Sequence, residues 1–142
     1  MSELLSNPVV LVPVIAWLAA EALKFGVRQA TGSDAKLGDT GGMPSGHAAF
    51  VTAVATIIGL REGLESPLFG LAAVLVAIVI HDAIRLRWSV GQQAERLNTL
   101  IANAKPEGVD PVIVWHGHRI REVLAGAAIG IGTAVLLNAW AY

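Results

Sequence analysis

Four apolar stretches separated by polar segments constrain the fold of this chain more than any other feature. They cover Pro8 to Leu23, Ala48 to Leu60, Pro67 to Ile80 (extended by Ala83 and Ile84) and Val123 to Tyr142. A helix needs about 20 apolar residues to cross a bilayer, so the fourth stretch is long enough alone while the second and third are short. Short stretches can cross where their neighbours line a protein interior. We therefore expect an all-α integral membrane helical bundle of about four spans.

The composition supports a single membrane domain over residues 1–142. Hydrophobic residues make up 54% of the chain and charged residues 15%, whereas soluble domains carry about 25% charged residues. A small soluble domain could not bury this much apolar surface. The net charge of −1 also disfavours nucleic-acid binding, which requires a basic surface. Met1-Ser2-Glu3 lacks the basic residues of a secretory signal peptide, so we expect the first stretch to be retained.

The polar region between the third and fourth stretches has a helical pattern of its own. Val90, Ala94, Leu97 and Ile101 recur at helical spacing, with polar residues on the opposite face. This pattern predicts an amphipathic helix, which fits equally in the membrane interface or packed on the bundle as a soluble helix. We include it in the predicted fold as an interfacial amphipathic helix.

The distribution of cations predicts an orientation in the membrane. Four spans place the two long polar segments, Lys24 to Gly46 and Ile84 to Arg121, on the same face. Nine of the ten Lys and Arg residues lie on that face, and only Arg61 lies on the other. The positive-inside rule therefore predicts a cytoplasmic location for it. Because so thin a bundle would gain contacts by association, and Gly126 and Gly130 have small-xxx-small spacing, a homodimer is a candidate assembly.

Two motifs on this face contain residues suited to catalysis. Gly41-Gly42-Met43-Pro44-Ser45-Gly46-His47 runs into the second apolar stretch, where the N–H groups of a helix start can bind an anion. His118 and Glu122 are four residues apart, so the carboxylate can accept the imidazole Nδ1–H and raise the basicity of Nε2. A nucleophilic imidazole needs this arrangement. A plain helix cap and a surface His–Glu pair are the structural alternatives.

Cations flank both motifs. Lys24 and Arg28 close the first stretch, and Arg85 and Arg87 follow the third. Guanidinium groups bind phosphate oxygens in a bidentate manner, and Lys binds them as a point charge. Lys and Arg also flank membrane spans for topological reasons alone. Their convergence with both histidines on one face favours a phosphate site.

These residues resemble the type-2 phosphatidic acid phosphatase superfamily, which also includes the vanadium haloperoxidases. Pro44-Ser45-Gly46-His47 resembles its second signature, and the segment from His118 to Gly126 resembles the end of its third, with Glu122 at the position of the usual Asp. The context is closer to a small branch often called the divergent members, on the strength of Gly41-Gly42-Met43, Asp82-Ala83, Arg87, Gly91, Gln93, Ala94, Leu97 and Asn98. The resemblance extends from about Lys24 to Gly130.

The resemblance implies a phosphatase that needs no metal or other cofactor and acts on a lipid phosphate or pyrophosphate. It implies that His118 attacks phosphorus and forms a phosphohistidine, that Glu122 orients His118, and that His47 protonates the leaving oxygen and later activates water. It also implies that phosphate oxygens are held by Lys24, Arg87, Ser45 and the Gly46 N–H.

The first signature departs from the family pattern. The Arg expected seven residues after Lys24 is replaced by Thr31, and Arg28 and Lys36 are the candidates to substitute for it. This departure supports an alternative function, a non-catalytic membrane protein of the same fold that binds anionic lipid or a partner.

The third signature departs as well, because the Arg expected six residues before the histidine is replaced by Val112. Arg87 is the first candidate to substitute for it, and Arg85 is the second. A further alternative is a zinc or copper site built from His47, His116 and His118.

Overall fold

The structure, a computed structural model, describes residues 6–30, 42–106, 108–115 and 117–141. Within these ranges the chain is all-α and contains no strand. Its elements in chain order are α2 (Pro8–Ala30), α3 (Gly46–Glu62), α4 (Pro67–His81), the π-helical turn η1 (Asp82–Leu86), α5 (Arg87–Ala104) and α6 (Ile120–Ala141). The predicted all-α class is confirmed for these residues.

Polar side chains set where three of the helices begin. Asn7 precedes α2 and its Oδ1 accepts the Val9 N–H at 2.9 Å. Ser45 caps α3, and its Oγ accepts the Ala48 N–H at 3.4 Å. Ser66 caps α4, with Pro67 at the first helical position. Such caps satisfy N–H groups that have no partner inside the helix.

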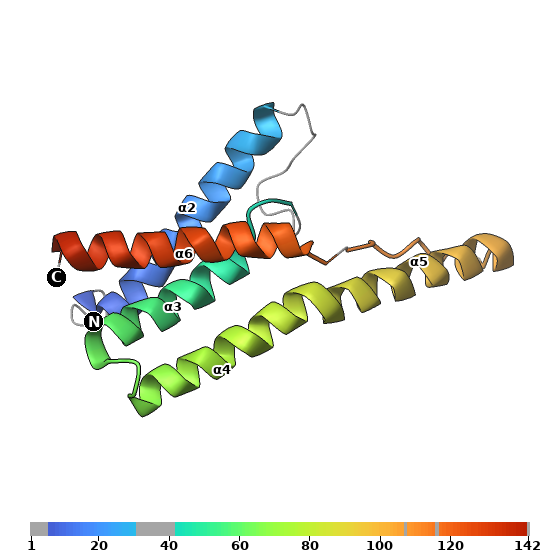
Figure 1. Ribbon diagram of the computed structural model, residues 1–142. Coiled ribbons are helices and arrows are strands. Elements are labelled where there is room, and N and C mark those ends of the chain that lie inside the picture. The colour runs from blue at the N-terminus through green and yellow to red at the C-terminus, as the bar shows by residue number, and fades with distance from the viewer. Residues whose placement is uncertain (1–5, 31–41, 107, 116, 142) are drawn as a thin grey trace.

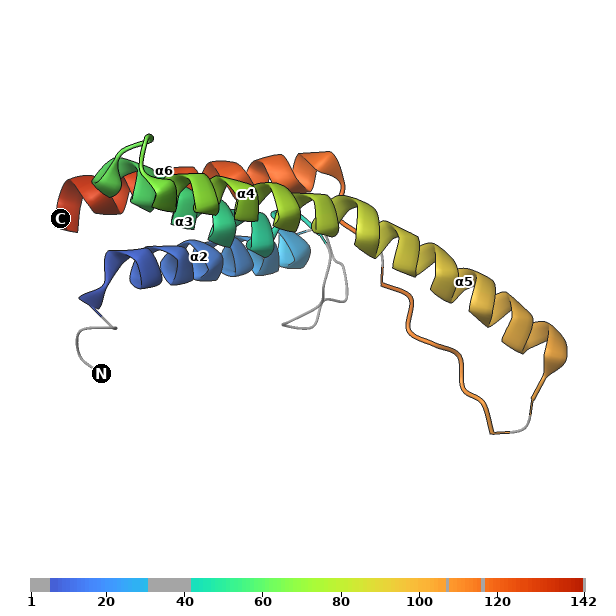
Figure 2. The ribbon, with the colours of Figure 1, turned by 90° about the horizontal axis from the view of Figure 1, so that it is seen from below.

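α3 occupies the middle of the bundle. It packs against α2, α4 and α6, and α2 also packs against α6 (Figures 1 and 2). The core consists of fully buried residues from three helices: Val12, Ala16, Ala53, Ile57 and Ala134. Most of these residues are small, which allows the helices to approach closely in the absence of large side chains.

One end of the bundle gathers the segments that contain the sequence motifs. The C-terminal end of α2, the N-terminal ends of α3 and α6 and the η1 turn lie at this end (Figures 1 and 2). The start of α2, the end of α6 and the short α3–α4 turn lie at the other end. The two long polar segments therefore leave the bundle on the same side, as the sequence predicts.

Three described helices are long and apolar enough to cross a membrane: Pro8–Ala30, Pro67–Ala104 and Ile120–Trp140. The sequence predicts about four spans, so three are supported by length and composition. The other helix, α3, has 17 residues, a length of about 25 Å, against a hydrocarbon core of about 30 Å. Neighbouring helices surround α3, which is the arrangement that a short span needs, and the crossing of the membrane by α3 stays a prediction.

The predicted amphipathic helix is present as α5, but it is not a separate element. α4, η1 and α5 form one continuous helix of 38 residues, and α5 projects past the bundle in Figure 2. The polar composition after Ile84 marks a change of environment, and this change does not interrupt the helical backbone. The location of α5 in the membrane interface stays a prediction.

The chain after α5 returns alongside that helix. The Asn98 side chain donates to the Val112 carbonyl oxygen and accepts the Val112 N–H, both at 2.8 Å. This pair of bonds attaches the extended 108–115 segment to α5. Asn98, which contributes to the family resemblance, thus positions the segment that leads to His118.

Gly126 and Gly130 face α3 of the same chain. A Cβ on Gly126 would overlap the Ser45 carbonyl oxygen, and one on Gly130 would overlap the Ala49 carbonyl oxygen. The Thr52 hydroxyl also bonds the Ala127 carbonyl oxygen at 3.3 Å across this contact. The small-xxx-small spacing therefore serves packing within one chain, and the homodimer stays a prediction with no support from these two glycines.

We predict that Gly130→Ala lowers the thermal stability of the detergent-solubilised protein by the equivalent of about 1–3 kcal/mol, because the added methyl group overpacks the α3–α6 contact. Gly132→Ala is the matched control, since nothing lies within 4 Å of a Cβ at that position. Thermal melting monitored by circular dichroism measures both variants. Equal melting temperatures would contradict the close approach at Gly130.

Candidate active site

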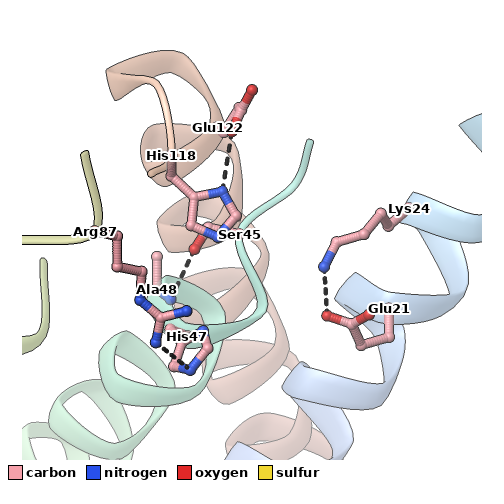
Figure 3. Close-up of polar contacts among 8 residues, drawn as sticks. All are labelled: Glu21, Lys24, Ser45, His47, Ala48, Arg87, His118 and Glu122. Atoms are coloured by element: carbon pink, nitrogen blue, oxygen red, sulfur yellow. Dashed lines mark hydrogen bonds and ion pairs between the residues drawn. The ribbon is translucent and has the colours of Figure 1, made fainter. Parts of the chain in front are cut away.

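His118 and Glu122 form a buried pair at the start of α6. His118 Nδ1 lies 2.9 Å from Glu122 Oε2, and the two side chains are 4% and 12% exposed. A carboxylate only accepts hydrogen bonds, so Nδ1 carries a proton, and in the neutral ring Nε2 then has the lone pair. Nε2 lies on the edge of the ring away from Glu122 (Figure 3). The pair therefore leaves a nucleophilic nitrogen available to a substrate.

Glu122 also stabilises the start of the helix that carries it. Its Oε2 accepts the Arg119 N–H at 3.2 Å, which is the glutamate half of a capping box. The carboxylate is thus held from two sides before it orients the imidazole. This dual contact limits the rotation of both side chains.

A backbone hydrogen bond joins the two motifs. The Ser45 N–H donates to the Glu122 carbonyl oxygen at 2.9 Å, and Gly126 allows the backbones to meet at this point. The contact brings the start of α3, with Ser45 and His47, next to His118 (Figure 3).

The η1 turn supports His118 from a third direction. The His118 N–H donates to the Ala83 carbonyl oxygen at 3.0 Å. A Cβ on the preceding residue, Gly117, would lie 2.8 Å from the Trp88 backbone nitrogen, so only glycine allows this approach. The π-helical turn thus forms a backbone surface against which the His118 segment packs.

Arg87 connects the long helix to His47. Its Nη2 lies 3.3 Å from His47 Nε2, and its Nε lies 3.7 Å from Asp82 Oδ2. A guanidinium only donates, so in this arrangement Nε2 of His47 is the acceptor and is unprotonated. His47 is more exposed than the buried His118. Arg87 is the first predicted substitute for the missing third-signature Arg and Arg85 the second. Of these two, Arg87 contacts His47.

Lys24 lies on α2, on the other side of the α3 start (Figure 3). Its Nζ is 2.6 Å from Glu21 Oε1, and its side chain is 7% exposed. Glu21 also lies against Gly46, where a Cβ would come within 2.6 Å of its Oε1. The Glu21–Lys24 ion pair therefore lies next to the N-terminal turn of α3, where the helix dipole favours anions.

The remaining predicted phosphate ligands have different positions. Ser45 is buried, and its Oγ is used as the α3 cap. Arg28 Nη2 lies 3.1 Å from the position of a Cβ on Gly42, so this guanidinium flanks the loop that enters α3. Arg85 is exposed on η1. Lys36 lies outside the described residues.

His47, His118, Lys24 and Arg87 and their acidic partners form what we call the active-site cluster. Two of its acidic residues have no role in the sequence-based prediction. Glu21 pairs with Lys24 and Asp82 with Arg87. The i,i+3 spacing of Glu21 and Lys24 is a signal that could have identified the first pair. The Asp82–Arg87 pair depends on the extra residue of the π-helical turn. The periodicity of the sequence gives no sign of this turn.

The predicted metal alternative involves His116, which lies outside the described residues. Among the residues that are described, no group of three His, Asp or Glu side chains is arranged to hold a metal ion. His118 uses Nδ1 for Glu122. The described geometry thus gives the metal alternative no support.

Comparison with known proteins identifies the family. Residues 5–133 match the model of the divergent PAP2 family, where PAP2 denotes type-2 phosphatidic acid phosphatase. The chain belongs to this family. A relative of this divergent PAP2 protein is the uncharacterized membrane protein YuiD of Bacillus subtilis, 35% identical over 152 aligned positions that cover 95% of this chain and 96% of YuiD. No solved structure matches the chain. The predicted family is confirmed, and the protein is a membrane protein.

We predict that Glu21→Gln destabilises the protein by at least about 1 kcal/mol, because it leaves the buried Lys24 ammonium without its counter-charge. Inorganic phosphate should raise the melting temperature of this variant more than that of the wild type, since an added anion can replace the lost carboxylate. Glu62→Gln, at the exposed end of α3, is the control and should melt within about 0.5 kcal/mol of wild type. Identical melting of the two variants would contradict the role of the Glu21–Lys24 pair.

Proposed function

We propose that this divergent PAP2 protein is a membrane phosphatase that hydrolyses a lipid phosphate or pyrophosphate through a phosphohistidine on His118. The observation that carries the proposal is the buried 2.9 Å bond between His118 Nδ1 and Glu122 Oε2. It supports a nucleophilic Nε2 beside the anion-attracting start of α3.

In the first step of the proposed reaction, the Nε2 lone pair of His118 attacks phosphorus in line with the leaving oxygen. The P–N bond forms and the P–O bond breaks, and the leaving oxygen takes a proton from His47. Glu122 stabilises the positive charge that develops on the His118 ring. A positioned acid contributes about 10²–10⁴-fold to such a step.

In the second step, water attacks the phosphohistidine and gives its proton to His47. The P–N bond breaks, inorganic phosphate leaves, and both histidines return to their starting states. The unprotonated Nε2 of His47 beside Arg87 is the form that this step needs. When Arg87 turns toward phosphate oxygens, it releases Nε2 to carry the proton of the first step.

Charge stabilisation supplies the largest part of phosphoryl-transfer catalysis. In the proposal, Lys24 and Arg87 hold the phosphate oxygens, with the Gly46 N–H, and Arg28 takes the place of the missing first-signature Arg. Ser45 donates its O–H to a phosphate oxygen in the proposal, because an Oγ that accepts the Ala48 N–H still has its own proton to donate. Arg85, which is exposed, adds to the positive electrostatic potential that attracts the phosphate.

A lipid substrate is favoured because the cluster lies at the end of an apolar bundle. A phosphate attached to a hydrocarbon chain can reach the cations while its chain stays in the membrane. We place this end on the cytoplasmic side, on the distribution of nine of the ten cations. The alternative, a non-catalytic protein that binds anionic lipid or a partner, uses the same cations without the His118 chemistry.

We predict that the purified protein releases inorganic phosphate from one or more members of a panel of lipid phosphates, and that EDTA does not reduce the rate. His118→Ala should abolish release because it removes the nucleophile, and orthovanadate should inhibit because it adopts the geometry of pentacoordinate phosphorus. His81→Ala, an exposed histidine on α4, is the control. Absence of release from every substrate, or undiminished release by His118→Ala, would refute the phosphatase and favour the non-catalytic alternative.

We predict that Glu122→Gln lowers kcat by about tenfold or more while the protein still folds, because the amide can accept the His118 N–H but no longer carries the charge that stabilises the imidazolium. Steady-state kinetics and thermal melting separate the two effects. A variant that loses stability but keeps the kcat of the wild type would show that Glu122 acts only as a helix cap.

A further inference from the structure

An apolar groove opens between α3, α4 and α6 on the membrane side of the active-site cluster. Its lining includes Thr52, Thr56 and Gly59 of α3, Phe69 and Ala73 of α4, and Ile131 of α6. The cavity volume is about 680 Å³, within the range of about 300–1,000 Å³ of small-molecule sites. It exists because α4 packs on α3 and stands away from α6.

The two hydroxyl groups in the lining do not make the groove polar. The Thr52 Oγ1 donates to the Ala48 carbonyl oxygen and the Thr56 Oγ1 to the Thr52 carbonyl oxygen, each at 2.7 Å. Both hydroxyls therefore have backbone carbonyl partners, and the groove has no charged side chain among its lining residues. Such a surface suits a hydrocarbon occupant, since a polar one would lose its hydrogen bonds to water.

The walls of the groove lead to the active-site cluster. On α3, Ser45, Ala48 and Thr52 follow one another at spacings of three and four, so they share a face. On the long helix, Val76 lines the groove, Ala83 bonds the His118 N–H and Arg87 contacts His47. Val76 and Ala83 are seven residues apart, about two α-helical turns, and Arg87 follows directly after the π-helical turn η1.

The depth of the groove matches one leaflet of a bilayer. Its α3 lining runs from Thr52 to Leu60, which at 1.5 Å per residue lies about 8–20 Å beyond His47. A hydrocarbon leaflet is about 15 Å thick, half of the full core. At its far end the groove reaches Gly59, where a Cβ would lie 3.0 Å from Leu64 Cδ2 and 3.1 Å from Phe69 Cδ2, so these two side chains pack against α3 there.

We propose that this groove holds the hydrocarbon tail of the substrate while its phosphate lies at His118, and that Gly59, Leu64 and Phe69 limit the length of tail that fits. That the head group of the bound lipid is a phosphate rests on the proposed function. The apolar lining, the continuity with the cluster and the single-leaflet depth together favour one chain of a lipid phosphate. Bulk membrane lipid and a second copy of the protein are the other occupants that the experiment separates.

The test uses the full-length wild-type protein in phosphatidylcholine nanodiscs and a hexadecylphosphonate with a diazirine at the end of its tail. The phosphonate has no P–O–C ester bond to hydrolyse, so it stays intact. The matched probe is hexadecanol with the same diazirine. After photolysis, mass spectrometry locates the labelled residues. We expect the phosphonate probe to label the groove end around Leu64 and Phe69 several times more than the alcohol does, and orthovanadate to remove that excess.

Variants on α4 provide a second arm. Ala73→Phe fills the groove and should suppress the head-dependent label, whereas Ala77→Phe, on an exposed residue outside the lining, should leave it unchanged. The comparison of the two probes on wild-type protein does not depend on how either variant folds. Equal labelling by both probes means bulk lipid and overturns the proposal, as do cross-links between two copies inside the groove.

A parallel assay of phosphate release separates this proposal from the proposed function. Head-dependent labelling of the groove without release from any lipid phosphate would refute the phosphatase and keep the groove as a lipid-phosphate site. Release from lipid phosphates with head-independent labelling would overturn the groove and keep the phosphatase.

Discussion

The contact between the starts of α3 and α6 is the interaction on which the rest of the structure depends. The Ser45 N–H bonds the Glu122 carbonyl oxygen at 2.9 Å, and a side chain on Gly126 would overlap the Ser45 carbonyl. Because the two backbones meet without side chains between them, the second and third motifs become neighbours although more than 70 residues separate them in the chain. The glycine at the end of the third signature thus has a packing role that the chemistry of the motif requires.

The charged groups near this contact are held in pairs. Glu21 holds Lys24, Asp82 lies near Arg87 and Glu122 holds His118. A charge without a partner is costly where water is scarce, so cations in such a place need counter-ions of their own. In the proposed function, a phosphate that enters the site exchanges one anionic partner for another. This exchange allows a cationic site to exist at the end of an apolar bundle without a permanently bound anion.

The sequence was sufficient to predict the all-α class and the gathering of both histidines with Lys24 and Arg87 at one end, and insufficient to predict the acidic partners Glu21 and Asp82 or the backbone contacts that support the site. Hydropathy located the apolar helices because burial in lipid is a local property of composition. The His118–Glu122 pair followed from i,i+4 spacing, which is also local. The continuation of α4 into α5 does not follow from the sequence, because a fall in hydropathy indicates a change of environment and not the end of a helix. The docking of His118 on Ala83 depends on a π-helical turn and on Gly117, and tertiary contacts of this kind leave no periodic signal.

The shortness of α3 explains why its N-terminal end lies between longer neighbours. α3 begins at Gly46 and has 17 residues, whereas α2 continues for six residues past Lys24 and the long helix continues to Ala104, well past Arg87. The neighbours of α3 therefore extend beyond its N-terminal end and surround it with Lys24 on one side and Arg87 on the other. In the proposed function, the same shortness that weakens α3 as a membrane span keeps the anion-attracting start of this helix between the two cations, where the phosphate of a lipid would bind.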